Sequence, residues 1–138
     1  MTHRLIEELN LAPHPEGGHY REDYRSECTT SIFFLLLAGE HSRWHRLPKR
    51  ELWQVLDGEL RLYVLGKTGE LRCNLLSVSD PVCTVLSGEW QAAEPVGEFA
   101  VCRCTVSPPF LPSDLEFGVA GQLAKQFPGH DDLIARLC

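Results

Sequence analysis

A series of short apolar segments between residues 29 and 107 constrains this chain more than any other feature, because turn sequences separate each segment from the next. In chain order the segments are TSIFFLLL, ELWQVL, LRLYVL, CNLLSV, CTVLSG and FAVCRCTV. Asp-Gly, Gly-Lys-Thr-Gly, Asp-Pro and Ser-Gly sequences lie between them, and such sequences favour turns. A repeat of about ten residues is typical of a β-sandwich or barrel and not of alternating strands and helices.

Short helices are expected on both sides of this β-rich region. Near the N-terminus, Leu5, Ile6 and Leu9 fall on one side of a helix. At the other end, GQLAKQFPGHDDLIARLC predicts one or two short helices interrupted at Pro128-Gly129. No linker, repeat or low-complexity segment divides the chain, so we predict one domain over residues 1–138.

Composition excludes several classes of partner. The net charge is -6 and the basic residues are scattered among acids, whereas nucleic-acid binders usually carry a basic face. The longest apolar run covers residues 32–38, far short of the roughly 20 residues of a membrane-spanning helix. The segment MTHRLIEELN lacks the apolar core of a secretory signal, and the six cysteines show no C-x-x-C spacing. We therefore expect a cytoplasmic protein with free thiols.

A glycine, a histidine, a glutamate and a second glycine recur at set distances as Gly39, His45, Glu51 and Gly58. Alternate side chains of a strand share a face, so a turn around residues 48–50 would direct His45 and Glu51 towards one interior. A histidine beside a carboxylate in an apolar barrel is suited to acid–base chemistry. We predict these two residues as the catalytic pair; the alternative is a buried histidine that simply hydrogen-bonds Glu51.

This spacing resembles the first cupin motif, with four of its five fixed positions present and Leu47 at the second histidine position. The second cupin motif is similar to residues 86–91, where Gly88 is kept and Gln91 stands at the histidine position. The resemblance implies an all-β double-stranded β-helix, a jelly-roll barrel, with a short N-terminal helix and short C-terminal helices.

The resemblance also bears on a metal, because a typical cupin metal has three histidines and one glutamate as ligands. At those positions this chain offers His45, Glu51 and the weak oxygen ligand Gln91. Protein sites for transition metals generally use three or four good ligands. We therefore expect no metal cofactor; if a metal does bind, these three residues are its expected ligands.

The segments LAPHPEGGHYRE, SRWHRLPKRELWQVLDG, GEWQAA and CTVSPPFLPSDLEF together resemble a small family of stand-alone cupin-like proteins, over roughly residues 11–118. Members of this family are generally dimers. Their fold is similar to that of nucleotide-sugar epimerases, which are metal-free cupins that use a histidine base. The resemblance implies a homodimer and a small ligand such as a nucleotide, a nucleotide-sugar or a phosphosugar.

Seven residues are candidates for contact with such a ligand. Arginines would supply cations for phosphate, and aromatic rings would supply a flat surface for a base. The alternative for the same residues is structural, with surface ion pairs and core packing. The seven ligand-binding candidates are Glu16, Arg21, Phe34, Arg43, Trp53, Gln91 and Arg103.

Three functions fit these observations. The first is an isomerase or epimerase that moves protons on a sugar or nucleotide-sugar without a metal. The second is a small-molecule binding protein without catalysis, whose barrel holds a ligand. The third is a metal-dependent cupin enzyme with the reduced ligand set. The sequence alone does not name the substrate.

Overall fold

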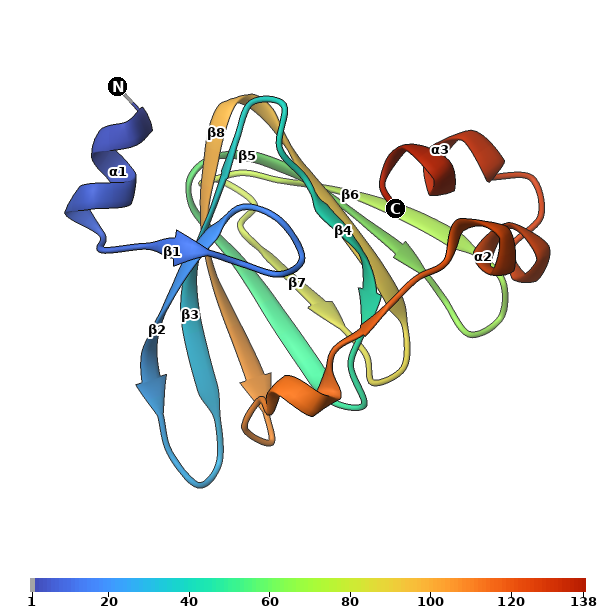
Figure 1. Cartoon of the computed structure of the whole chain (residues 1–138), viewed down its shortest axis with the longest axis horizontal. Coiled ribbons are helices and arrows are strands. Elements are labelled where there is room, and N and C mark those ends of the chain that lie inside the picture. Colours follow the sequence, from blue (N-terminus) through green and yellow to red (C-terminus); the bar gives the residue numbers. More distant parts are fainter. Residues whose placement is uncertain (1) are drawn as a thin grey trace.

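The computed structural model describes residues 2–138, with side chains from residue 4 onward, and shows a curled β-structure with short helices at its two ends (Figure 1). Its elements are α1 (Thr2–Glu8), β1 (Ala12–Pro13), β2 (His19–Arg25), β3 (Thr30–Leu37), β4 (Ser42–Arg46), β5 (Arg50–Leu65), β6 (Leu71–Leu76), β7 (Val82–Val85), β8 (Trp90–Ser107), a 3-10 turn η1 (Pro112–Asp114), β9 (Glu116–Phe117), α2 (Ala120–Gln126) and α3 (Asp131–Arg136).

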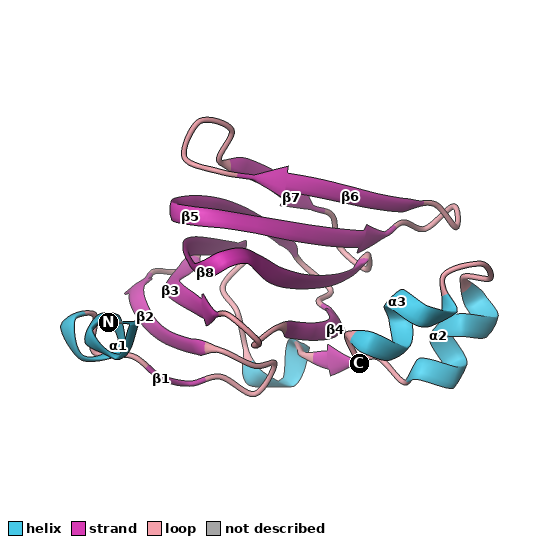
Figure 2. Ribbon diagram, turned by 90° about the horizontal axis from the view of Figure 1, so that it is seen from above, coloured by secondary structure: helices cyan, strands magenta, loops and turns pink. Residues whose placement is uncertain are grey.

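The two longest strands, β5 and β8, each run through two facing sheets. The second half of β8 lies between β3 and the first half of β5, and its first half lies between β4 and the second half of β5. One sheet therefore has the order β1-β2-β3-β8-β5-β7, and the other has the order β9-β4-β8-β5-β6. All pairings are antiparallel, and the layers curl around one interior (Figure 2). The predicted all-β jelly roll is confirmed.

A bulge, and not a turn, joins the two halves of β5. The register against β8 shifts on either side of Gly58, which has a φ of 80°. A Cβ atom at Gly58 would lie 2.2 Å from the carbonyl oxygen of Phe99, so the bend needs a glycine. The turn predicted at Asp57-Gly58 was wrong, because the bulge carries one strand from the first sheet into the second without ending it.

Apolar side chains form two separate cores. The first fills the interior between the sheets and includes Trp53 and Leu62. The second lies where α2 and α3 pack, and it joins Trp44 and Trp90 to Ile134. Both C-terminal helices and the N-terminal helix were predicted, as was the break between α2 and α3 at Pro128-Gly129. None of the helices over residues 2–138 is long and apolar enough to cross a membrane.

The side chains of the strand that carries Glu51 alternate between buried and more exposed positions, as the alternation of a strand requires. Glu51, Trp53 and Val55 are buried, whereas Leu52 and Gln54 between them are partly exposed. The expected hairpin between β4 and β5 was wrong, because β4 pairs with β8 and β9 in the other sheet. His45 and Glu51 therefore approach the interior from opposite sheets, which allows them to face each other across it.

Candidate functional site

A cavity of about 360 Å³ lies inside the barrel between the two sheets. Most of its wall is apolar, and this part includes Ile32, Leu47, Val106, Phe110, Pro112 and Leu115. The polar groups of the wall include two histidines and two buried glutamates. An apolar pocket with a few convergent polar groups is the usual form of a ligand site, and this volume is near the small end of the common range.

The loop of residues 14–18 delivers the first of these glutamates to the cavity. The loop closes on itself through a 2.9 Å bond from the His14 amide to the Gly18 carbonyl. It also crosses the start of β4, where the Arg43 amide donates to the Glu16 carbonyl at 2.8 Å. Gly17 has a φ of 112°, and a Cβ there would lie 2.0 Å from the carbonyl oxygen of His41. The glycine is therefore required for the close approach that buries Glu16.

Glu16 and His45 form a buried ion pair in the cavity wall. Nε2 of His45 lies 3.0 Å from Oε2 of Glu16, and Nδ1 donates to the Arg43 carbonyl at 2.8 Å. Burial lowers the pKa of His45, but the Glu16 carboxylate outweighs it and raises that pKa to about 9. Burial likewise raises the pKa of Glu16, and the imidazolium reverses this and holds the pKa below its usual value. At neutral pH the pair is an imidazolium and a carboxylate.

Glu51 has the opposite protonation preference. It is 6% exposed, and the Gln91 amide donates to its Oε1 at 2.8 Å. Trp53 donates its indole N–H to the Gln91 oxygen at 2.6 Å, which fixes the orientation of the amide. Burial and then the Glu16 charge raise the pKa of Glu51 to about 7, although His45, Gln91 and the Cys104 thiol favour the carboxylate. Glu51 can therefore both accept and release a proton near neutral pH.

His14 is a cavity residue that the sequence analysis missed. It lines the same cavity, and its Nδ1 accepts a 3.0 Å hydrogen bond from the Glu16 amide. Burial lowers the pKa of His14, and the partly opposing effect of the Glu16 charge does not restore it. The ring is therefore neutral at pH 7. Its position two residues before Glu16 in the same glycine-rich loop was the signal in the sequence.

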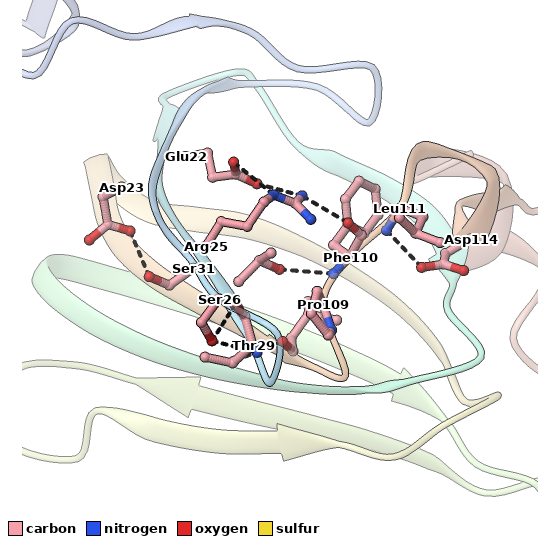
Figure 3. A network of polar contacts seen from close by, with 12 residues as sticks. Glu22, Asp23, Arg25, Ser26, Thr29, Ser31, Pro109, Phe110, Leu111 and Asp114 are labelled. Carbon is pink, nitrogen blue, oxygen red and sulfur yellow. Dashed lines mark hydrogen bonds and ion pairs between the residues drawn. The ribbon is translucent and has the colours of Figure 1, made fainter.

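Residues 108–115 form a strap whose Phe110, Pro112 and Leu115 line the cavity. Figure 3 shows the polar contact of this strap with Arg25. Arg25 joins the strap to the barrel, because its guanidinium donates to Glu22 at 2.8 Å and to the Phe110 carbonyl at 2.9 Å. Within the strap, the Leu111 amide donates to Asp114 at 2.8 Å. Arg25 also lines the cavity and was not predicted as a site residue.

The structure brings the predicted polar cluster together. Glu16, His45 and Glu51 all line the cavity, and Gln91 and Trp53 lie behind Glu51 as its hydrogen-bonded support. Phe34 packs edge-on against the Trp53 ring, with a centroid distance of 5.8 Å, in the interior core.

The three arginines predicted to contact ligand are engaged elsewhere and are not part of the cavity wall. Arg21 donates to the Leu9 carbonyl at 2.7 Å. Arg43 stacks on the Phe117 ring, with its guanidinium carbon 3.7 Å from the centroid. The third, Arg103, pairs with Asp23. Their role in phosphate binding stays a prediction.

The positions that hold a metal in typical cupins do not suit one here. Both ring nitrogens of His45 are engaged, Leu47 has no donor atom, and Gln91 directs its amide N–H to Glu51. Over residues 2–138, no group of three or more histidine, cysteine, aspartate or glutamate side chains is arranged to hold a metal ion.

Comparisons with known proteins agree with the fold. The model of the family described as "Cupin superfamily (DUF985)" matches residues 3–118. A search of the curated proteins gives no match.

Several solved structures are similar over nearly the whole chain. A protein from Shewanella oneidensis is 32% identical, with a TM-score of 0.89, over 97% of this chain and 94% of that one. A hypothetical protein from Leishmania major is 26% identical, with a TM-score of 0.91, over 100% of this chain and 98% of that one. Oxalate decarboxylase from Bacillus subtilis is 16% identical, with a TM-score of 0.70, over 91% of this chain and 36% of that one. At that identity, the last similarity shows the fold alone.

Proposed function

Because the chain belongs to the DUF985 family of the cupin superfamily and encloses a ligand-sized cavity, we propose that it is a metal-independent isomerase or epimerase acting on a small polar molecule. The observation that carries this proposal is Glu51, a buried carboxyl group in the cavity wall with a pKa of about 7. A proton carrier works best when its pKa lies near the working pH, and buried carboxyl groups with this property are concentrated at catalytic sites.

In this proposal Glu51 is the proton carrier and His45 is its charged partner. Both ring nitrogens of His45 already donate hydrogen bonds, and its pKa of about 9 keeps it protonated, so it is poorly suited to act as a base. Its positive charge favours the carboxylate form of Glu51, while burial and the Glu16 charge favour the acid form. The balance between these effects lets Glu51 take a proton from a substrate and return it.

The cavity favours a small, uncharged ligand such as a free sugar. Its volume of about 360 Å³ is near the small end for ligand pockets. Among the residues of its wall, Arg25 is the one arginine or lysine, and Glu22 already neutralises it. A nucleotide-sugar, the ligand expected from the family resemblance, would have to place its phosphates at Arg25 near the strap.

A second candidate function is supported by the largely apolar wall. A barrel that holds a ligand without changing it needs the cavity and the strap but does not need a carboxyl group that titrates near neutral pH. The two candidates therefore differ in what they require of Glu51, and this difference decides the experiment.

The test begins with a thermal-shift screen of free sugars, phosphosugars, nucleotides and nucleotide-sugars. Each compound that raises the Tm is then incubated in D2O with wild type or Glu51→Gln, and NMR follows the exchange of its carbon-bound protons. We expect exchange with wild type, loss of exchange with Glu51→Gln, and no change with Glu59→Gln, an exposed control on β5. Binding without exchange would support the binding protein, and exchange unaffected by Glu51→Gln would exclude Glu51 as the proton carrier.

A further inference from the structure

The hydrogen bonding of His14 fixes which of its nitrogens carries the proton. The Glu16 amide donates to Nδ1 at 3.0 Å, so Nδ1 is the acceptor and the neutral ring must be protonated at Nε2. This Nε2–H has no acceptor within hydrogen-bond distance among the described side chains and backbone of residues 4–138. Because the ring lines the cavity, its N–H is available to a ligand.

Neighbouring rings hold His14 in place. The His14 ring packs in a T-shaped arrangement against two aromatic rings, with a centroid distance of 4.6 Å to Tyr20 and 5.6 Å to Phe34. The loop of residues 14–18 thus organises both histidines of the cavity: the Glu16 backbone sets the tautomer of His14, and the Glu16 side chain holds His45 as a cation. One histidine is a neutral donor and the other is a fixed charge.

We infer that His14 is a second catalytic residue, which donates its Nε2–H to the carbonyl oxygen of the substrate while Glu51 removes a proton from the adjacent carbon. The inference rests on the proposed function of Glu51 and extends it by naming the substrate class. That class is uncharged α-hydroxy aldehydes and ketones, the open-chain forms of free sugars. A carboxylate base combined with a neutral imidazole donor is a known solution for this type of proton transfer.

The step balances without a further reactant. The Glu51 carboxylate takes the proton from the carbon next to the carbonyl group, and the C–H electron pair becomes the new C=C bond. The carbonyl π pair moves to oxygen, where the His14 N–H stabilises the negative charge. For an isomer, the hydroxyl proton passes to the oxyanion, the hydroxyl oxygen becomes the new carbonyl oxygen, and Glu51 returns its proton to the former carbonyl carbon. For an epimer, the enediolate turns over in the cavity, Glu51 returns its proton to the opposite face of the same carbon, and the original carbonyl group re-forms. The product is an isomer or an epimer, and no net oxidation or reduction occurs.

A neutral donor suits this task because it stabilises the developing oxyanion without adding another charge to the wall. The cavity already holds the Glu16 carboxylate and the His45 imidazolium, which offset each other. An imidazolium at His14 would lose the hydrogen bond from the Glu16 amide, since a protonated Nδ1 cannot accept it.

The experiment measures C–H exchange in D2O with dihydroxyacetone, xylulose and fructose as probes, using wild type, His14→Phe and His14→Gln. Phenylalanine keeps the ring packing against Tyr20 and Phe34 but removes the donor, whereas glutamine keeps a neutral N–H. We expect His14→Phe to lower kcat about 100-fold with little change in KM, and His14→Gln to recover part of the loss. Nitrogen-15 NMR of the wild type should show His14 protonated at Nε2 alone.

The outcomes separate this inference from the proposed function. Wild-type exchange rates in His14→Phe, with Glu51→Gln inactive, would overturn the role of His14 and leave Glu51 as the proton carrier. Failure of wild type to exchange any of the three carbonyl probes would overturn the substrate class. A His14 ring protonated at Nδ1 would overturn the hydrogen-bond geometry whatever the activity. A Tm within a few degrees of wild type confirms that each variant is folded.

Discussion

Glu16 and Glu51 share one cavity wall, yet their environments push their pKa values in opposite directions. Glu16 faces an imidazolium at 3.0 Å, which keeps it ionised despite its burial. Glu51 is also fully enclosed, but its nearest support is the uncharged amide of Gln91, and the Glu16 charge opposes its ionisation. Two carboxyl groups of the same type therefore have different roles, and the difference is set by which of them lies next to His45.

Replacing Glu51 with glutamine should change how stability depends on pH. The folded state raises the pKa of Glu51 from 4.5 to about 7, so its stabilising contribution is complete below pH 4.5 and is lost as the pH rises through about 7. Glu51→Gln cannot titrate, so its free energy of unfolding should fall less across this range. As the pH rises from about 5 to about 8, the free energy of unfolding of the variant should increase by on the order of 2 kcal/mol relative to that of wild type.

Urea denaturation at several pH values measures this difference. Glu59→Gln, on the exposed part of β5, serves as the control and should retain the wild-type pH dependence. Parallel curves for wild type and Glu51→Gln would show that Glu51 does not titrate in this range.

Replacing Glu16 with glutamine should lower the pKa of His45, because the substitution removes the carboxylate that stabilises the imidazolium. The raised pKa of His45 means that its stabilising contribution is complete below pH 6.5 and is lost as the pH rises through about 9. Without the carboxylate, the largest of the effects that raise the His45 pKa are absent, so this pKa should fall from about 9 and the loss of stability should move to lower pH. Breaking the buried pair should also cost on the order of 3 kcal/mol at neutral pH.

NMR titration of the His45 ring, together with denaturation at neutral pH, tests both parts. Glu116→Gln removes the exposed partner of Arg46 and should cost less than about 1 kcal/mol. A His45 pKa that stays near 9 in Glu16→Gln would mean that another group, such as Glu51, holds the proton.

At the scale of elements, Gly17 and Gly18 allow the loop of residues 14–18 to pack closely enough on the barrel to form one wall of the cavity. The loop must pass within van der Waals distance of the backbone before β4, and at Gly17 a side chain would overlap the His41 carbonyl. The loop also carries both His14 and Glu16, so one backbone distortion would displace two of the polar groups in the cavity.

Gly17→Ala should therefore destabilise the protein and weaken ligand binding together. Gly69→Ala is the matched control, because Gly69 also has a positive φ, of 93°, but has open space around it. The control should show only the backbone cost of about 1–3 kcal/mol, and Gly17→Ala should exceed it. Chemical denaturation of both variants, with the pH titration of His45 as a readout of the cavity, makes the comparison. Equal costs for the two variants would mean that the loop relaxes away from His41.

At the scale of the whole molecule, the site chemistry predicts that removing metal ions changes nothing. Of the four cupin ligand positions, Leu47 has no donor atom, both ring nitrogens of His45 are engaged, and Gln91 donates its amide N–H to Glu51. Treatment with a chelator should leave the Tm unchanged, and elemental analysis of the purified protein should show no stoichiometric transition metal. A bound metal whose removal lowers the Tm would support the metal-dependent cupin instead.

The homodimer also stays a prediction, one that rests on the resemblance of the sequence and on the unpaired edges of both sheets. Within residues 2–138, strands β7 and β6 each pair with β5 alone, and an exposed strand edge is commonly covered by another chain. Light scattering at tens of micromolar should give twice the monomer mass of 15.6 kDa. A mass equal to the monomer would count against it.

The sequence by itself determined the jelly roll and the faces of its strands. Side-chain alternation is a local property of a strand, so burial of Glu51 and Trp53 on one side of β5 could be read directly from residues 51–56. His45 and Glu51 both line the cavity, as their spacing indicated, but they reach it from opposite sheets and not from one hairpin. The termini were predictable for the same reason, since short helices and a proline–glycine break depend on neighbouring residues.

Only the tertiary structure decided what these residues do. Whether Asp57-Gly58 ends a strand or bends it depends on β8, which continues across the bend and supplies the Phe99 carbonyl against it. The protonation of His45 depends on Glu16, which lies 29 positions earlier in the chain and reaches it through a loop that crosses β4. Electrostatic and hydrogen-bond effects act over a few ångströms in space and not along the sequence. The pKa values of the site, and the neutral state of His14, therefore exist only once the barrel has closed.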